Sequence, residues 1–503
     1  MDEQEQRRAG RPEAEPADAH ERPRARRPEP SSHTAENAGN AELEPVPRSQ
    51  LGLARKLLTI AGPVVLTQLG MMGFGVVDTL MLGRVGVAEL DAAALGNLWL
   101  WGTMVFGIGV VFGLDPIIAH AIGRGDGEAA GLALQRGGVL GLLLAIPLSA
   151  SAWLAEEALL ALGQEPALAA AAESYLTVQA WSVLPLLWFY ALRQYLQARE
   201  IVAPALWVTL IANLANVAGN ELLIFPHELL GLAWPGYGLR GAGLASAITR
   251  ALLAVGLVAW TLARGHLRGA WPSWSRAAWS RAGLAELLRF GVPVGLQYTL
   301  EVWAFQVSTL LAGELGRNAL AAHTIALNVA SVTFMVPLGI SFSASTLIGS
   351  LVGAGRREAA QRIAWLSLAL GGGFMLVSAA LLISARSWLP HLYTDELEVV
   401  VLATSILPIA AAFQLFDGLQ VVGGGILRGT GDTLPAAIFN AVAYYGVALP
   451  LAAYLVLVAG AGLTAIWWSM ALGLALVAGT LLVWIRQRGP ARARPGPAVE
   501  GSD

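Results

Sequence analysis

The dominant feature of this chain is a series of long apolar stretches separated by short polar connections. Each stretch reaches the roughly 20 residues that a helix needs to cross the hydrocarbon core of a bilayer. Several contain Pro or Gly, which membrane helices tolerate because neighbouring helices and water satisfy the freed backbone groups. We therefore predict an all-α polytopic membrane protein of about 12 transmembrane helices. The predicted spans are 57–82, 90–121, 132–155, 171–193, 201–225, 241–264, 285–312, 319–352, 362–385, 399–427, 433–459 and 461–486.

Composition supports the same class of protein. Of the 503 residues, 55% are hydrophobic and only 13% are charged. Soluble globular proteins carry about 25% charged residues, so this chain has too little charge to cover a water-facing surface. The net charge of −3 gives no reason to expect a nucleic-acid partner. The absence of cysteine excludes a disulfide framework, cysteine-ligated zinc and an iron–sulfur cluster.

The connections between the spans alternate in charge. Even-numbered connections carry arginines, whereas odd-numbered connections are acidic or poor in charge. The positive-inside rule then places both termini in the cytoplasm of a multi-pass protein, which we expect in the inner (plasma) membrane of a bacterial-type cell. The basic residues are Arg124, Arg193, Arg199, Arg264, Arg268, Arg276, Arg281, Arg356, Arg357, Arg362 and Arg428, and the acidic ones are Glu156, Glu157, Glu165, Glu228, Asp395, Glu396 and Glu398.

An internal repeat divides the chain into two halves. The motif at 123–130 (GRGDGEAA) recurs at 353–360 (GAGRREAA), an offset of 230 residues. Because six spans separate the copies, the two six-helix lobes enter the membrane in the same sense, as parallel repeats do in two-lobed transporters. The predicted organisation is an N-terminal tail at 1–50, a lobe at 51–264, a cytoplasmic linker at 265–283, a second lobe at 284–486 and a cytoplasmic tail at 487–503. The first tail is rich in Glu, Arg, Pro and Ala, so we expect it to be disordered and cytoplasmic.

Three acidic residues stand out inside the apolar spans: Asp78, Glu301 and Asp417. A carboxylate at mid-membrane raises the free energy of insertion by about 2.5–3.5 kcal/mol, so each one needs a reason. A functional role predicts that their helix faces line a lobe interior or a water-filled cavity. The simpler alternative is that buried acids and amides only tie helices together through hydrogen bonds.

Each acid has polar companions at helical spacing. Gln297 precedes Glu301 by four residues, and Gln414 and Gln420 lie three residues to either side of Asp417. On another span Asn213, Asn216 and Asn220 form a stripe at intervals of three and four. These spacings place each group on one helix face. We predict two polar clusters, one in each lobe.

Other functional classes find less support in the sequence. No Gly-rich loop is followed by the Lys-Ser/Thr of a nucleotide-binding motif, and the histidines have no metal-ligand spacing. A membrane-embedded enzyme would need clustered nucleophiles, bases or metal ligands, which the pattern lacks. A flippase for lipid-linked sugars would line its cavity with basic residues. The polar faces identified within the spans instead carry acids and no arginine.

Several segments resemble the multidrug and toxic compound extrusion (MATE) family. Residues 77–83 (VDTLMLG) with Pro63, and residues 90–94 (LDAAA), resemble its first helix signature. Residues 321–328 (AAHTIALN), running on to 334–337 (FMVP), resemble the eighth helix of the NorM-like branch. Residues 427–433 (LRGTGDT) resemble the loop after its tenth helix, and the resemblance extends in order over roughly residues 50–486.

This resemblance implies roles for particular residues. The functional acids of the family fall on Asp78, Glu301 and Asp417, its polar pair on helix 5 falls on Asn216 and Asn220, and a polar position on helix 6 falls on Ser246. Some relatives have an aspartate where this chain has Asn220, so a cation site in the N-terminal lobe would carry less charge here.

The resemblance also implies an activity. It predicts a secondary antiporter, not an enzyme, that exports small organic cations in exchange for Na⁺ or H⁺, without a cofactor and as a monomer in the bilayer. With Na⁺ as the coupling ion, Glu301 and Asp417 would be ligands. Two alternatives stay open at Asp78: it carries a proton, or it holds Na⁺ in an oxygen cage completed by Asn216 and Asn220. The NorM-like match at Glu301 favours Na⁺.

Overall fold

The computed structural model describes residues 49–229, 232–268, 270–271 and 273–493. The first six predicted spans are formed by α1 (Gln50–Leu82), α2 (Val87–Phe112) with α3 (Leu114–Gly123), α4 (Gly127–Ala150) with α5 (Ala155–Ala161), α6 (Pro166–Gln179) with α7 (Val183–Ala198), α8 (Ala203–Ile224) and α9 (Gly238–Ala263). The last six are formed by α10 (Arg281–Glu314), α11 (Arg317–Gly353), α12 (Arg357–Ala385), α13 (Leu397–Thr430), α14 (Leu434–Asn440) with α15 (Leu449–Ala453), and α16 (Leu463–Arg488).

The predicted helical membrane fold is confirmed. Within the described residues, 11 helical segments are long and apolar enough to cross a membrane. The 34-residue α10 is as long as these segments but is not among them. Its interior carries Gln297, Glu301 and Gln306, and such side chains lower the mean hydropathy of a span. The seventh predicted span, 285–312, is therefore the least apolar one, and it carries one of the three predicted acids.

Four of the predicted spans are interrupted. Gly113 separates α2 from α3, and short 3₁₀ turns at Ser151–Leu154 and Ala180–Ser182 separate α4 from α5 and α6 from α7. The eleventh span contains two π-helical segments, Ala441–Ala448 and Tyr454–Val458. Such irregular turns in a helix are frequent near functional sites. The predicted spans run through all of these breaks, although Asp115 and Pro116 closely follow the break at Gly113.

Small elements at the edges of the bundle also differ from the prediction. Strands β1 (His227–Leu229) and β2 (Leu232–Trp234) form an antiparallel hairpin between α8 and α9. The predicted tail at 487–503 begins later, since α16 runs to Arg488 and a 3₁₀ turn at Pro490–Arg492 follows. Gln361 on α12 anchors that turn, because its Oε1 accepts a hydrogen bond of 3.1 Å from the Ala491 N–H. The predicted disordered tail at 1–50 lies almost wholly outside the described residues.

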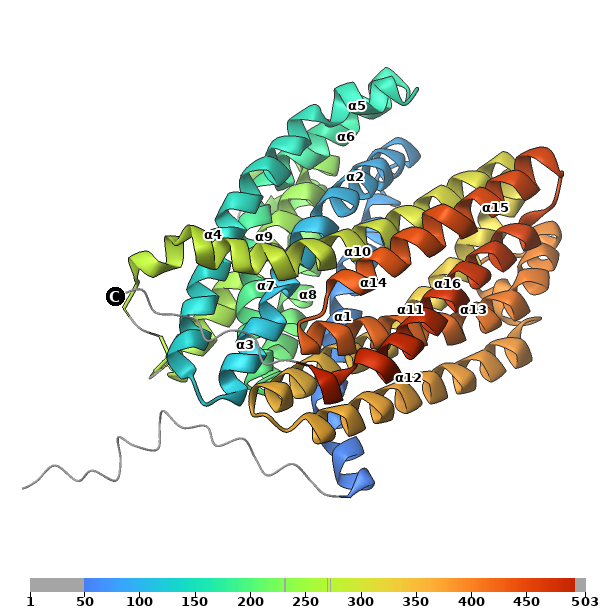
Figure 1. Cartoon of the computed structure of the whole chain (residues 1–503). Helices are drawn as coiled ribbons and strands as arrows, with labels where there is room; N and C mark the ends of the chain where they lie inside the picture. The colour runs from blue at the N-terminus through green and yellow to red at the C-terminus, as the bar shows by residue number, and fades with distance from the viewer. Residues whose placement is uncertain (1–48, 230–231, 269, 272, 494–503) are drawn as a thin grey trace, which may run out of the picture.

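The two halves of the chain meet at one end of the bundle. We name this the basic end; it carries the connections 124–126, 199–202, 264–280, 354–356 and 431–433, and the opposite end is the acidic end. The two halves approach each other closely at Gly113 and Gly291. If Gly113 carried a Cβ atom, that atom would lie only 2.4 Å from the Gly291 Cα. Only glycine permits such backbone contact between α2–α3 and α10. In Figure 1 the α5–α6 tip at the top and the α15–α16 connection at the right diverge.

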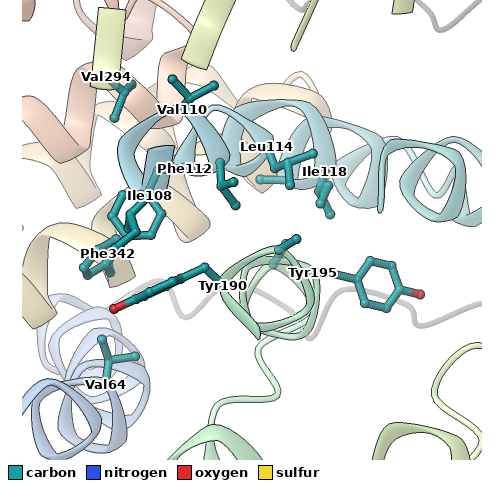
Figure 2. Close-up of a cluster of buried hydrophobic side chains, with 14 of the residues drawn as sticks. Val64, Ile108, Val110, Phe112, Leu114, Ile118, Tyr190, Tyr195, Val294 and Phe342 are labelled. Atoms are coloured by element: carbon teal, nitrogen blue, oxygen red, sulfur yellow. The ribbon is translucent and has the colours of Figure 1, made fainter. Parts of the chain in front are cut away.

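Aromatic side chains fill the contact between the halves. Phe112 packs edge-to-face against Tyr190 at 5.6 Å, Tyr298 at 5.7 Å and Phe342 at 5.1 Å between ring centroids. Figure 2 shows Tyr190 from α7 and Phe342 from α11 turned toward one another above Val64 of α1. Such pairs stabilise by about 0.5–1.5 kcal/mol beyond the burial of their area. This aromatic cluster fills the space between the two halves toward the basic end.

The predicted topology can be tested in this chain because it has no native cysteine. Ser273 lies exposed in the linker at the basic end, and Gln164 lies exposed at the acidic end between α5 and α6. If the basic end is cytoplasmic, an impermeant thiol reagent added to intact cells will label Gln164→Cys and leave Ser273→Cys unreacted. Labelling of Ser273→Cys from outside would reverse the topology.

Candidate functional site

The C-terminal half brings two of the predicted acids into one buried cluster. Glu301 on α10 is 7% exposed and Asp417 on α13 is 5% exposed, and the two carboxylates are close enough to interact electrostatically. Glu301 Oε2 accepts a hydrogen bond of 3.0 Å from the Gln420 side-chain N–H. The same Gln420 nitrogen lies 3.4 Å from the Asn440 side-chain oxygen on α14. The cluster therefore joins three helices of this half.

Several oxygens of this cluster have no partner. Asp417 Oδ1, Gln420 Oε1 and the Tyr444 hydroxyl are buried without a hydrogen bond. Tyr444 lies within electrostatic reach of both carboxylates. As far as the structure describes the chain, neither Glu301 nor Asp417 forms an ion pair with a basic side chain. Unpartnered buried oxygens raise the free energy of the folded state, so each calls for an explanation.

A bound cation would resolve both features. Two carboxylates at close range repel one another, and a proton or a cation between them removes that repulsion. Carboxylate, amide and hydroxyl oxygens are the ligands that hard cations prefer. Glu301, Asp417, Gln420 and Tyr444 thus fit a small hard cation such as Na⁺. The same residues would equally fit a shared proton.

Two of the other predicted polar residues do not join the carboxylates. Gln414 bridges helices instead: its Nε2 donates to the Thr333 hydroxyl at 2.9 Å, and its Oε1 accepts from the Ser378 hydroxyl at 3.0 Å. The Gln297 side chain lies against Gly424 on α13, where a Cβ atom would be 2.8 Å from its Nε2. For Gln414 the simple interpretation, a tie between helices, therefore holds.

The N-terminal half holds the third acid in a different setting. Asp78 on α1 is 4% exposed. Its Oδ1 accepts hydrogen bonds from the side-chain N–H groups of Asn220 at 2.6 Å and Asn216 at 3.4 Å. Its Oδ2 accepts a short hydrogen bond from the Ser246 hydroxyl on α9. The predicted grouping of these four residues is thus what the fold assembles.

Asn213 does not belong to this group. Its side-chain N–H donates to the backbone oxygens of Gly70 on α1 and Thr209 on α8, both at 2.9 Å. It ties α8 to α1 and does not reach the Asp78 carboxylate in the hydrogen bonds of the structure. The stripe of three asparagines therefore divides into one helix tie and two partners of the acid.

The prediction that the polar faces carry no arginine is wrong. Arg250 lies near the middle of the 26-residue α9 and lines the same cavity as Asp78. Its Nη1 donates to the Ser182 hydroxyl at 3.2 Å, and its charge interacts with the Asp78 carboxylate. The rule that identified the acids, a charge within an apolar span, applies equally to Arg250. The sequence pattern could therefore have revealed it.

A second charged pair was also missed. Asp115 on α3 and Arg428 on α13 form an ion pair of 3.3 Å that links the two halves near the basic end, and Asp115 is fully buried. The Arg428 Nη1 also donates to the Tyr298 hydroxyl at 3.1 Å, and its guanidinium lies 4.9 Å from the Phe342 ring centroid. The sequence predicts Arg428 only as one of the basic residues that indicate topology at the end of a span. In the structure it is buried, and its ion pair with Asp115 holds the two halves together.

A groove of about 730 Å³ opens between the halves at the acidic end. It is lined by residues of α2 and α6 and by Gln306 of α10, and it contains Asp91 at its rim. Asn97 and Trp101 are shared with a smaller cavity of about 30 Å³ that contains Asp78 and Arg250. Asn97 and Trp101 therefore lie between the groove and the cavity of Asp78.

A further cavity lies away from the acids. It has a volume of about 820 Å³ between α4, α7, α9 and the linker, and is lined mostly by apolar residues and tryptophans. None of the three acids contributes to it. Apolar walls and interfacial tryptophans are what a lipid-facing surface requires. We therefore place the functional site at the acids and the groove.

These features define a class: a polytopic membrane transporter whose two halves meet at one end, open a groove at the other and bury acids inside. The profile of the MatE family matches residues 63–222 and 293–454, two segments whose starts lie 230 residues apart, as in the internal repeat. Since these segments cover more than half of the chain, it belongs to the MatE family. Its relatives include probable multidrug resistance proteins NorM.

Two relatives show the extent of the similarity. The chain is 34% identical over 443 residues to a probable multidrug resistance protein NorM of Mesorhizobium japonicum, covering 86% of this chain and 94% of that protein. It is 35% identical over 436 residues to the corresponding protein of Bradyrhizobium diazoefficiens, covering 85% and 92%. Among solved structures, the fold is similar to the crystal structure of the eukaryotic MATE transporter AtDTX14, with a TM-score of 0.81 at 23% identity over 88% of this chain and 98% of that one. The predicted MATE relationship is confirmed.

Proposed function

We propose that this protein is a secondary antiporter that exports small organic cations in exchange for Na⁺ or H⁺. The observation that carries the proposal is the buried pair Glu301 and Asp417, whose cluster has unpartnered oxygens. No basic side chain is ion-paired with either carboxylate in the described structure. A permanently vacant anionic site would be unfavourable in a medium of low polarity. Exchange of one cation for another keeps it neutralised through the cycle.

The groove suits an organic cation at the acidic end. Asp91 at its rim supplies a negative charge, and the half-exposed Trp101 supplies an aromatic face. A cation over the face of a tryptophan is attracted by the ring by about 0.5–2 kcal/mol. Asp78, beside the groove, is proposed as a further point of contact for the substrate.

The exchange uses alternating access between the two halves. The basic side is closed by Phe112 and its aromatic neighbours and by the pair of Asp115 and Arg428. Opening that side while closing the groove would carry substrate and ion in opposite directions. We propose that the lobes are 51–264 and 284–486, joined by the linker, in a monomer in the plasma membrane with both termini in the cytoplasm.

Proteoliposome efflux with separately imposed gradients tests the proposal. Purified protein is reconstituted with a fluorescent organic cation inside the vesicles, and a Na⁺ gradient or a pH gradient is applied alone. Efflux against the substrate gradient under either condition is expected. If the organic cation leaves the vesicles no faster than it leaves protein-free vesicles under both conditions, antiport is rejected.

A flippase for lipid-linked sugars is the second candidate, because Arg250 places a basic side chain in the cavity beside the groove. A flippase would move a lipid with an anionic phosphate group, and ion gradients would not drive efflux of an organic cation. Translocation of a labelled lipid phosphate without organic-cation efflux in the same vesicles would favour this candidate.

A further inference from the structure

Arg250 is a fixed positive charge that the proposed exchange does not use. It lies near the middle of α9, and its one hydrogen-bonded partner in the structure is Ser182 in the 3₁₀ turn between α6 and α7. It lines the cavity of about 30 Å³ that also contains Asp78. A charged side chain at this depth is costly unless another charge offsets it. Asp78 is the acid of that cavity, and its carboxylate interacts with the guanidinium.

The partners of Asp78 are all hydrogen-bond donors. Asn216 and Asn220 present their side-chain N–H groups to Oδ1, and Ser246 presents its hydroxyl to Oδ2. Donors stabilise a carboxylate but repel a metal cation, which requires oxygen lone pairs directed at it. The arrangement is therefore the opposite of the oxygen cage that the sequence suggested for Na⁺.

The two halves thus differ in charge although they are repeats of one another. In the C-terminal half, Glu301 and Asp417 form no ion pair within the described residues, and their cluster has unpartnered oxygens. In the N-terminal half, one carboxylate and one guanidinium line the same cavity, and Asn220 Oδ1 beside Asp78 is also buried without a hydrogen bond. Electrostatic interactions between such groups are several-fold stronger in a protein interior than in water. A mobile cation would be attracted to the first site and would gain no net attraction at the second, where the two charges cancel.

We propose that Arg250 determines ion specificity by serving as a built-in counter-cation for Asp78, so that the N-terminal cavity excludes Na⁺ and cation exchange is confined to Glu301 and Asp417. This inference rests on the proposed cation exchange and assigns its two sites different roles. Without the charge at Arg250, Na⁺ can take the place of the guanidinium beside Asp78, and the amides of Asn216 and Asn220 can then turn their oxygens toward the bound ion. Asp78 then becomes a cation ligand.

A purely structural role for Arg250 makes a different prediction. The hydrogen bond to Ser182 ties α9 to the turn between α6 and α7. If this tie were its only role, Arg250→Gln and Arg250→Lys would both lower thermal stability and neither would change ion binding. The proposed role requires that the two variants differ in Na⁺ binding, because only the lysine variant keeps a positive charge at this position.

The test is ²²Na⁺ binding to the purified full-length chain in detergent. Arg250→Gln is expected to bind one more equivalent of Na⁺ per chain than the wild type, and Arg250→Lys to bind the same amount as the wild type. The additional equivalent should disappear in the double variant Arg250→Gln with Asp78→Asn. Arg250→Met serves as a second neutral variant in case the Gln variant does not fold.

A further measurement changes Asp78 while Arg250 is kept. Asp78→Asn alone should leave Na⁺ binding unchanged, and a loss of bound Na⁺ in this variant would overturn the proposal. Equal binding by the wild type and a folded Arg250→Gln or Arg250→Met variant would also overturn it. The proposed exchange at the C-terminal pair is judged separately, by the effect of Glu301→Gln on the Na⁺ bound by the wild type.

Discussion

Glu301→Gln and Asp417→Asn will each abolish coupled efflux while the protein still folds and inserts. These substitutions keep the size of each side chain and much of its hydrogen bonding but remove the charge that we propose holds the coupling cation. One charge moving through 100 mV supplies about 2.3 kcal/mol, which corresponds to about a 50-fold concentration ratio at 1.4 kcal/mol per factor of ten. We expect this accumulation ratio in proteoliposomes to fall to about one in both variants.

The matched control is Glu314→Gln. Glu314 lies on the same helix as Glu301, but it is exposed at the acidic end. Its neutralisation removes one carboxylate from α10 without touching the buried cluster, so efflux should stay at the wild-type level. Wild-type accumulation in both Glu301→Gln and Asp417→Asn would show that the coupling ion binds elsewhere.

The second large effect is expected at the pair that closes the basic side. Asp115→Ala or Arg428→Ala leaves one unpaired charge in a fully buried position between the halves. Loss of one partner from a buried ion pair destabilises a protein by about 3–5 kcal/mol. The unpaired charge gains hydration when the halves separate at the basic end, so the variants should also favour the state that is open to that side. A lower thermal unfolding midpoint is the first readout.

The second readout is the reactivity of a cysteine in the closed contact. Ser350 is buried where α11 meets Gly123, and a Ser350→Cys probe has no competing native thiol. Its labelling in inside-out vesicles should increase in Asp115→Ala and Arg428→Ala. Unchanged labelling and stability in both would show that the pair does not hold the contact.

Two further variants separate the charge effect from packing. Lys56→Gln breaks an ion pair of 2.8 Å with Glu200 whose side chains are 13% and 26% exposed, and such a pair contributes only about 0–1 kcal/mol. The double variant Asp115→Leu with Arg428→Met removes both charges together. Because replacing a buried pair by apolar residues is often neutral, the double variant should be closer to the wild type than either single variant.

The sequence by itself determined the class of fold and the residues with functional chemistry. Lipid cannot form hydrogen bonds with polar groups, so each membrane helix has a continuous run of apolar residues in the sequence. A charged residue inside such a run is therefore easy to recognise. For this reason the helical membrane fold and the unusual positions of Asp78, Glu301 and Asp417 could be predicted. Arg250 obeys the same rule and could have been found with them. The π-helical segments of the eleventh span could not, because apolar residues continue through them. At Gly113 the following Asp115 and Pro116 do mark the break.

Only the tertiary structure decided which polar residues act together. A helical spacing places Asn213, Asn216 and Asn220 on one face, yet Asn213 binds the backbone of α1 while the other two reach Asp78. The difference arises from the depth at which α1 and α8 pack, which no pattern along one helix contains. The pairing of Asp115 with Arg428 joins residues 313 positions apart in the chain. Hydropathy is a property of each helix alone, whereas a site is made where faces of several helices meet, and that depends on how the side chains pack.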